Sequence, residues 1–116
     1  MSIGQFAPET FPTDTPTTVT VAAELKHLCP FVNEADNGRA TITWATDGAS
    51  IELHSLSEYL GGFTTQTISH EALTHLIEQE LEGLEGIAEV TVTTHWVTAG
   101  MDITCSTSPT PAARRQ

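Results

Sequence analysis

The sequence is poor in cations, in cysteine and in long apolar runs. Lysine and arginine together number 4 against 15 aspartates and glutamates, which gives a formal net charge of −11 at pH 7. The two cysteines, Cys29 and Cys105, lie far apart and form neither a disulfide framework nor a C-x-x-C pair. No apolar run approaches the roughly 20 residues that span a bilayer, and residues 1–18 lack the basic and apolar regions of a signal peptide. We therefore expect a reduced, cytoplasmic protein with no membrane partner.

Several motifs of catalysis and binding are missing as well. The chain has no P-loop, no G-x-G-x-x-G, no G-x-S-x-G and no basic aromatic stripe for nucleic acid. His70 and His75 are five residues apart, whereas a zinc-binding helix places two histidines four apart. Cys29 and Cys105 would share a metal with a histidine only by a coincidence of the tertiary fold. We therefore predict no metal ligands.

The excess of acidic residues indicates the solvent in which the protein works rather than the kind of partner that it binds. Lys26 is the only lysine, and threonine is abundant throughout. This composition is typical of a protein that works in concentrated salt, where self-repulsion is screened and the Debye length is only ~3 Å at about 1 M. We predict a halophilic protein, whose acidic surface would not forbid contact with nucleic acid. The alternative is an ordinary acidic domain.

The 116 residues suffice for one domain. Residues 1–16, which contain Pro8, Pro12 and Pro16, are predicted to form an irregular N-terminal arm. Residues 106–116 are rich in Ser, Thr, Pro and Ala, and we predict a disordered tail there. The folded domain is expected over residues 17–105.

Periodic patterns predict the elements between the arm and the tail. Alternating β-branched and apolar residues favour strands at 18–21, 40–44, 50–53, 88–93 and 101–105. Residues 70–82 have the spacing of an amphipathic helix that Ser69 caps and Gly83 ends, and a shorter helix is expected at 56–60. The order predicts an α+β fold, an antiparallel sheet with helices on one face. Such a sheet has two bare edges, so we expect a homo-oligomer with pockets between chains.

Cys29 is the first candidate for chemistry. It follows the first strand in Leu28-Cys29-Pro30, and a cysteine on a loop leaving a sheet can act as a nucleophile where its thiolate is favoured. Lys26 and His27 could supply positive potential. The alternative is a small buried thiol, an interpretation that Cys105 fits well.

Two acidic positions accompany this cysteine. Asp36 follows it by seven residues, and a carboxyl near a reactive thiol can give and take protons. Its alternative is an acid in a surface turn. His70 and Glu71 form a polar pair at the start of the longer helix, where a glutamate can also simply stabilise the helix.

The spacing of these residues resembles the QueF family of 7-cyano-7-deazaguanine (preQ0) nitrile reductases. That family has E-x-x-S-L-C-P, an aspartate seven residues after the cysteine, V-E-[S/L]-K, and then His-Glu. This chain has 24-ELKHLCP-30, Asp36, 51-IEL-53 and 70-HE-71, over residues 17–105.

The resemblance implies a tunnelling (T-) fold, in which ββααββ subunits assemble into an oligomeric barrel. It also implies roles for individual residues. Cys29 would attack the nitrile carbon to form a covalent thioimide, and Asp36 would donate the proton. Five residues would hold the deazaguanine ring: Ile51, Glu52, Leu53, His70 and Glu71.

The departures from the family pattern concern the cofactor. The reductases hold NADPH through E-[S/L]-K-[S/A]-h-K, whereas this chain has His54 and Ser57 at the two lysine positions. The family's R-G-G is here 98-TAG-100. Because a dinucleotide phosphate needs cationic donors, NADPH binding should be weak, and no cofactor-binding residue is predicted.

A retained thioimide apparatus without the NADPH contacts resembles the QueF-like branch, the archaeosine-forming amidinotransferases. Their thioimide is opened by ammonia to a formamidine, on a base that is already part of tRNA. We therefore predict an amidinotransferase with ammonia as co-substrate and no cofactor. Four alternatives remain: an NADPH-dependent reductase that forms the aminomethyl product, the same chemistry on DNA, a T-fold binding protein without catalysis, and a metal-dependent pterin-type T-fold enzyme.

Overall fold

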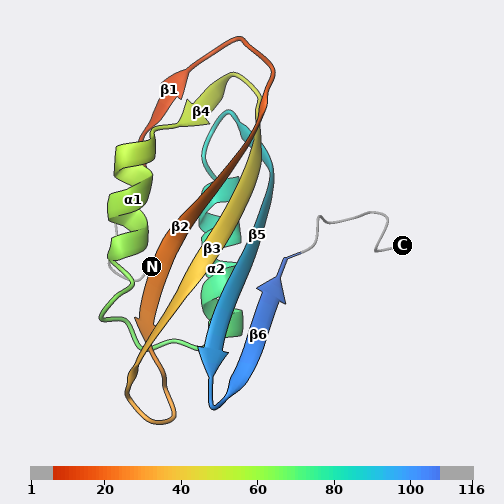
Figure 1. Ribbon diagram of the computed structural model, residues 1–116. Coiled ribbons are helices and arrows are strands. Elements are labelled where there is room, and N and C mark those ends of the chain that lie inside the picture. Colours follow the sequence, from red (N-terminus) through yellow and green to blue (C-terminus); the bar gives the residue numbers. More distant parts are fainter. Residues whose placement is uncertain (1–6, 108–116) are drawn as a thin grey trace.

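The computed structural model of the chain describes residues 7–107. Eight elements follow one another along them (Figure 1): β1 (Thr10–Pro12), β2 (Thr18–Leu28), β3 (Ala35–Thr46), β4 (Ala49–Ile51), α1 (Leu53–Gly61), α2 (His70–Glu82), β5 (Ile87–Thr98) and β6 (Met101–Ser106).

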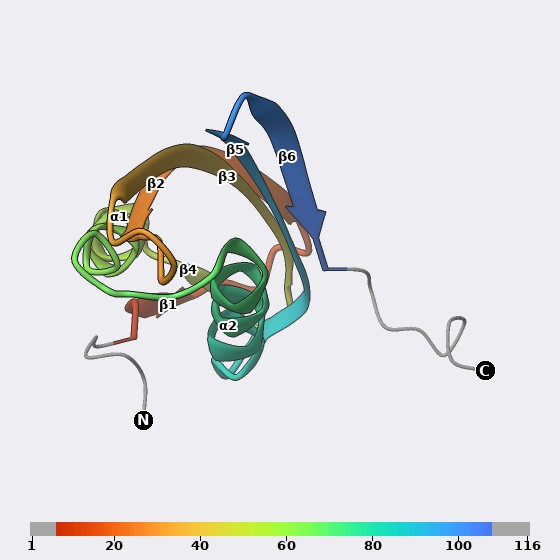
Figure 2. The same ribbon diagram turned by 90° about the horizontal axis from the view of Figure 1, so that it is seen from below.

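The main sheet has four strands in the order β2-β3-β5-β6, and every neighbouring pair is antiparallel. The sheet is strongly curved, and both helices lie on its concave side together with the small β1-β4 sheet (Figure 2). The predicted α+β fold with helices on one face of an antiparallel sheet is therefore confirmed.

The core forms where strand alternation and helix periodicity meet. Ala40, Ile42 and Trp44 of β3 are fully buried, because every second side chain of a strand points to the same face. Leu73 and Ile77 of α2 are fully buried against them, as the spacing of an amphipathic helix requires.

The longer helix has the predicted bounds and caps. The Ser69 hydroxyl accepts a hydrogen bond from the Ala72 N–H at 3.1 Å, and Gly83 follows the last helical residue. This helix holds His70 in its first turn, next to the sheet.

The two short strands, β1 and β4, differ from the element boundaries predicted from the sequence. The predicted irregular arm contains β1, which pairs with β4, and Pro12 fits there because it stands at the end of an edge strand. The strand expected over residues 50–53 ends at Ile51. The Glu52 carboxylate accepts the N–H groups of His54 at 3.0 Å and Ser55 at 2.7 Å, so the helix starts at Leu53 rather than at residue 56.

The C-terminal boundary also moves slightly. Ser106, assigned to the tail, pairs with Thr93 and belongs to β6. Thr107 follows it and donates its N–H to the Val92 carbonyl at 2.9 Å, whereas residues 108–116 of the predicted tail lie outside the described residues. Within residues 7–107, neither helix has the length and apolar character to cross a membrane.

The sheet has two ends that matter for the site (Figure 1). One end holds the β2–β3 loop, the start of α2 and the β5–β6 turn, and the other holds β4 and the start of α1. At about 3.3 Å per residue, β2 alone separates these ends by roughly 33 Å. We call them the α2 end and the β4 end.

Candidate functional site

Three polar side chains meet at the α2 end. His27 of β2 and Asp36 of β3 are direct partners in the strand register, so their side chains lie on the same face. The Asp36 Oδ2 atom is 3.2 Å from His70 Nε2 and 3.8 Å from His27 Nε2. The Thr98 hydroxyl donates to Asp36 Oδ1 at 3.5 Å. Asp36 is therefore not a turn residue, because strand β3 already begins at Ala35.

Trp96 of β5 forms the wall of this cluster. Its ring stacks on His70, with centroids 4.5 Å apart and planes 10° from parallel, and it meets His27 edge-on at 4.8 Å. Gly38 lies opposite Trp96 in the β3–β5 register. A Cβ atom at Gly38 would stand 2.4 Å from the Trp96 ring, so only glycine admits this packing.

His27 has a determined tautomer. Its Nδ1 lies 3.1 Å from the Leu28 carbonyl oxygen, which can only accept, so Nδ1 carries the proton and Nε2 has a free lone pair. The side chain is 1% exposed, and Nε2 has no hydrogen-bond partner. Burial lowers the pKa of His27, and this effect exceeds the opposite effect of Asp36. His27 therefore does not supply the positive potential expected of it.

Cys29 follows the last residue of β2, on a loop that leaves the sheet, as predicted. Its N–H donates to the Glu34 carbonyl at 2.8 Å, which extends the β2–β3 pairing by one step. Its thiol is partly buried, and Sγ accepts the Phe31 N–H at 3.4 Å. Because side chains alternate along a strand, Cys29 lies on the same side of the hairpin as His27 and Asp36.

Glu71 and Cys105 lie beside this cluster. Glu71 is exposed in the first turn of α2. Burial raises the pKa of the Cys105 thiol, and the negative charge of Glu71 raises it further. Cys105 is partly buried on β6 and is thus neither ionised nor freely accessible, which agrees with a packing role.

The other predicted ring-binding residues lie at the β4 end. Ile51 is 1% exposed and belongs to the core, whereas Leu53 is 54% exposed. The Glu52 carboxylate is occupied by the N–H groups of His54 and Ser55, which lower the pKa of Glu52 to about 2. One chain therefore brings Cys29, Asp36, His70 and Glu71 to one end, and leaves residues 51–53 at the other.

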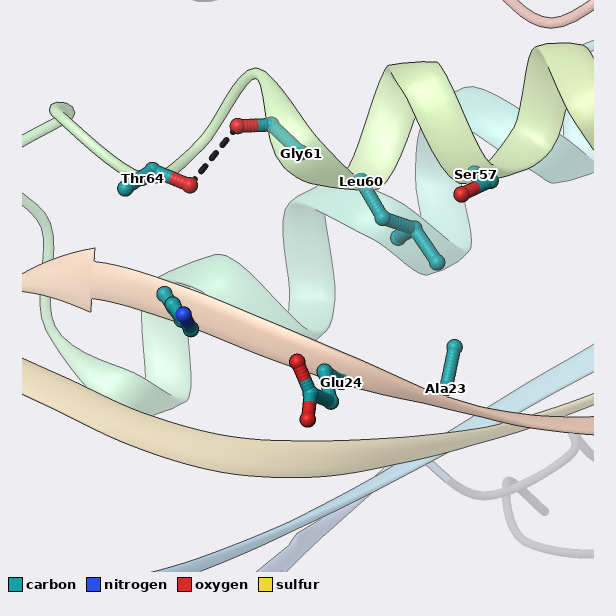
Figure 3. A pocket seen from close by; sticks show the side chains of 7 residues that line it. Ala23, Glu24, Ser57, Leu60, Gly61 and Thr64 are labelled. Atoms are coloured by element: carbon teal, nitrogen blue, oxygen red, sulfur yellow. Dashed lines mark hydrogen bonds between the residues drawn. The ribbon is translucent and has the colours of Figure 1, made fainter.

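A pocket lies between α1 and β2 (Figure 3). It has a volume of about 400 Å³ and is lined by Ala23, Glu24, Lys26, Ser57, Leu60, Gly61 and Thr64. Ser57 stands at one of the two positions where the reductase pattern has lysine. Lys26 is the one cation among these lining residues and shares the pocket with the Glu24 carboxylate.

One group within residues 7–107 has the donors for a metal ion: His27, Asp36 and His70, whose ligand atoms lie within 4.8 Å of one another. Sequence spacing did not indicate this group, because its members come from two strands and a helix. The one available signal was His27 itself, which stands where the family pattern has serine. Trp96, Gly38 and Thr98 were missed as site residues for the same reason.

Comparison with known proteins gives relatives of one kind. No family model matches the chain. NADPH-dependent 7-cyano-7-deazaguanine reductases of Chlorobaculum parvum and Chlorobium phaeovibrioides are 34% and 31% identical to it over 91 residues, 78% of each chain. The reductase of Rhodopirellula baltica is 30% identical over 77 residues, which cover 66% of this chain and 64% of that one.

One solved structure is similar in fold. A crystal structure of the archaeosine synthase QueF-Like in the apo form superposes with a TM-score of 0.74 at 18% identity. The match covers 81% of this chain and 94% of the other, so the two chains share their fold.

Proposed function

Because this chain belongs to the QueF family of 7-cyano-7-deazaguanine reductases, we propose that it converts the nitrile of 7-cyano-7-deazaguanine to a formamidine. The observation that carries the proposal is the position of Cys29 directly after β2, where its hydrogen bond to Glu34 continues the strand pairing two residues beyond the His27–Asp36 pair. A nucleophile beside a carboxyl is what addition to a nitrile requires.

The first step forms a thioimide. The Cys29 sulfur bonds to the nitrile carbon, the C≡N triple bond becomes C=N, and the thiol proton moves to the nitrile nitrogen by way of Asp36. His70 and Thr98 hold the two oxygens of that carboxyl, which keeps it aimed at the reacting atoms.

The second step consumes ammonia. Its nitrogen bonds to the thioimide carbon, the C–S bond breaks, and a proton lost by the incoming nitrogen returns to Cys29. The sum is nitrile plus ammonia giving formamidine, with no change of oxidation state and no cofactor.

The absence of lysine at positions 54 and 57 favours ammonia over NADPH. His54 has a fully exposed side chain, and Ser57 shares its pocket with the Glu24 carboxylate. A dinucleotide phosphate, which needs charge-assisted hydrogen bonds from cations, would find Lys26 as the one cation of this pocket, beside the opposing Glu24 carboxylate.

A second candidate is the NADPH-dependent reductase. It is favoured by the curated relatives, which carry that activity in their names. This reaction adds two hydrides to the same thioimide carbon and yields the aminomethyl product, so it needs two NADPH for each nitrile.

We further propose that the base is part of tRNA and that two chains build each site. The tRNA substrate rests on the resemblance to archaeosine-forming enzymes, and DNA is the alternative polymer. The shared site would unite the α2 end of one chain with residues 51–53 of another. Both ends carry exposed apolar side chains: Phe31, Val32, Val97 and Met101 at the α2 end, and Phe11 and Leu53 at the β4 end.

Intact-protein mass spectrometry tests the function. The protein is incubated with 7-cyano-7-deazaguanine in high salt, and ammonium and NADPH are then added separately. We expect a mass gain equal to the base, absent in Cys29→Ala, and release of a formamidine by ammonium. Release of an amine by NADPH would establish the reductase instead. No adduct with either the free base or modified tRNA would refute both.

A further inference from the structure

The His27–Asp36–His70 cluster contains an unexplained feature. His27 Nε2 is completely buried, carries a lone pair and has no partner, although buried polar atoms in folded proteins are nearly always satisfied. Asp36 Oδ2 lies 3.8 Å from it, which is beyond hydrogen-bond range. An ionised carboxylate would also present another lone pair to it.

A cation resolves this arrangement. In metal sites, a ligating histidine typically donates its second ring N–H to a carbonyl or carboxylate, which fixes the tautomer. His27 already has this arrangement, since Nδ1 donates to the Leu28 carbonyl at 3.1 Å and Nε2 points into the cluster.

The three donor atoms are close enough for one cation to gather them. Two ligand atoms that each lie about 2.1 Å from a metal are roughly 3.0–3.4 Å apart in octahedral or tetrahedral geometry. Asp36 Oδ2 is 3.2 Å from His70 Nε2 and 3.8 Å from His27 Nε2, and all three ligand atoms lie within 4.8 Å of one another, so the His70–Asp36 side already has this length and a bound metal would draw His27 closer to the other two. His70 and Asp36 are each only slightly exposed, which leaves a path for an ion to enter.

We propose that His27, Asp36 and His70 bind a divalent transition-metal cation of the Zn²⁺ class. Two imidazole nitrogens and one carboxylate suit zinc, cobalt or iron, whereas magnesium and calcium take oxygen ligands almost throughout. Three protein ligands leave further coordination positions for water.

The cation has a consequence for catalysis that rests on the proposed function. Asp36 Oδ2 cannot carry a proton to the nitrile while it coordinates a metal. His70, whose Nε2 is then also a metal ligand, can no longer bind the deazaguanine ring. The metal-bound form is the inactive form of the site, and cation and nitrile exclude each other.

Cobalt(II) absorption tests the site directly, without any substrate. The full chain without a histidine tag is stripped with a chelator and titrated with Co²⁺, whose visible bands report nitrogen ligands and low coordination number. We expect one Co²⁺ per chain, displaced by Zn²⁺. His27→Ser, which introduces the residue of the family pattern, should weaken binding at least about tenfold.

The control variant is His75→Ala, which removes an exposed histidine from the same helix and should bind Co²⁺ like the parent. Asp36→Asn should lose binding as well, and circular dichroism checks that each variant is folded. Equal affinity of the parent and a folded His27→Ser, or no stoichiometric binding by the parent, would overturn the proposal.

The adduct assay tests the inhibition. Zn²⁺ should suppress the mass gain from 7-cyano-7-deazaguanine, and a chelator should restore it. An adduct that forms equally well with Zn²⁺ bound would refute the inhibitory role. If the metal-free protein forms no adduct, the proposed function fails, and the cobalt titration still decides the metal site.

Discussion

Replacing Gly38 with alanine tests whether the packing of Trp96 controls the candidate site. The added Cβ would stand 2.3 Å from the His95 carbonyl oxygen and 2.4 Å from the Trp96 ring, distances that real Cβ atoms essentially never show. Because the first of these atoms belongs to the backbone of β5, which pairs with β3 and β6, relief of the clash requires the strand to shift together with the Trp96 ring. That ring is 2% exposed and stacks on His70, so its movement reaches the cluster.

The magnitude follows from two opposing effects. Overpacking a close-packed interior typically costs about 1–3 kcal/mol. Alanine also restricts the unfolded chain, which returns about 0.4–1 kcal/mol. We therefore expect a net loss of roughly 1–2 kcal/mol in the free energy of unfolding. In a domain of this size, each kcal/mol corresponds to about 4–8 °C in melting temperature.

Gly61→Ala is the matched control, because a Cβ at Gly61 meets no atom within 4 Å. Thermal unfolding of both variants in the same salt gives the stability difference, and the rate of Cys29 adduct formation gives the effect on the site. We expect Gly38→Ala to lose stability and adduct rate, and Gly61→Ala to retain both. If the two variants behave alike in both assays, the role assigned to Trp96 packing is wrong.

Three further predictions concern assembly, acid and salt. Co-expression of Cys29→Ala with Glu52→Ala should restore adduct formation to about a quarter of the sites, because each intact site then takes Cys29 from one chain and Glu52 from the other. Co-expression of Cys29→Ala with Asp36→Ala, whose altered residues lie at the same end, should restore no sites. Equal failure of both pairs would contradict the shared site. The pKa of Glu52 is lowered to about 2 from 4.5, so the stability that its helix cap contributes is present above pH 4.5 and is lost as the pH falls towards 2. The melting temperature over this range should therefore fall more for the parent than for Glu52→Gln. Parallel curves for the two proteins would contradict the capping role. Raising the salt from about 0.1 M to about 1 M shortens the Debye length from ~10 Å to ~3 Å, so with a net charge of −11 the melting temperature should rise, and a flat or falling curve would refute the halophilic interpretation.

Local sequence patterns determined the elements and the two residues of the proposed chemistry. The helix over residues 70–82 has the bounds, the Ser69 cap and the terminal Gly83 that its periodicity predicted, because helix signals depend on residues within one or two turns. Strand positions were right but their lengths were not. β2 extends to Leu28, and all eleven of its residues pair with β3. Its inward positions beyond Val21 include the small Ala23 and the polar His27, which hide the continuing alternation in the sequence.

Only the tertiary structure decided which residues meet. The register of two strands sets His27 opposite Asp36, and the docking of α2 adds His70 from 34 positions further along than Asp36. The same structure separates residues 51–53 from this cluster by the length of the sheet. Neither fact is visible in local patterns, because register and helix docking follow from burial summed over the whole core rather than from neighbours in sequence. The candidate nucleophile could therefore be named from the sequence, whereas the histidine pair around the Asp36 carboxyl could only be derived from the fold.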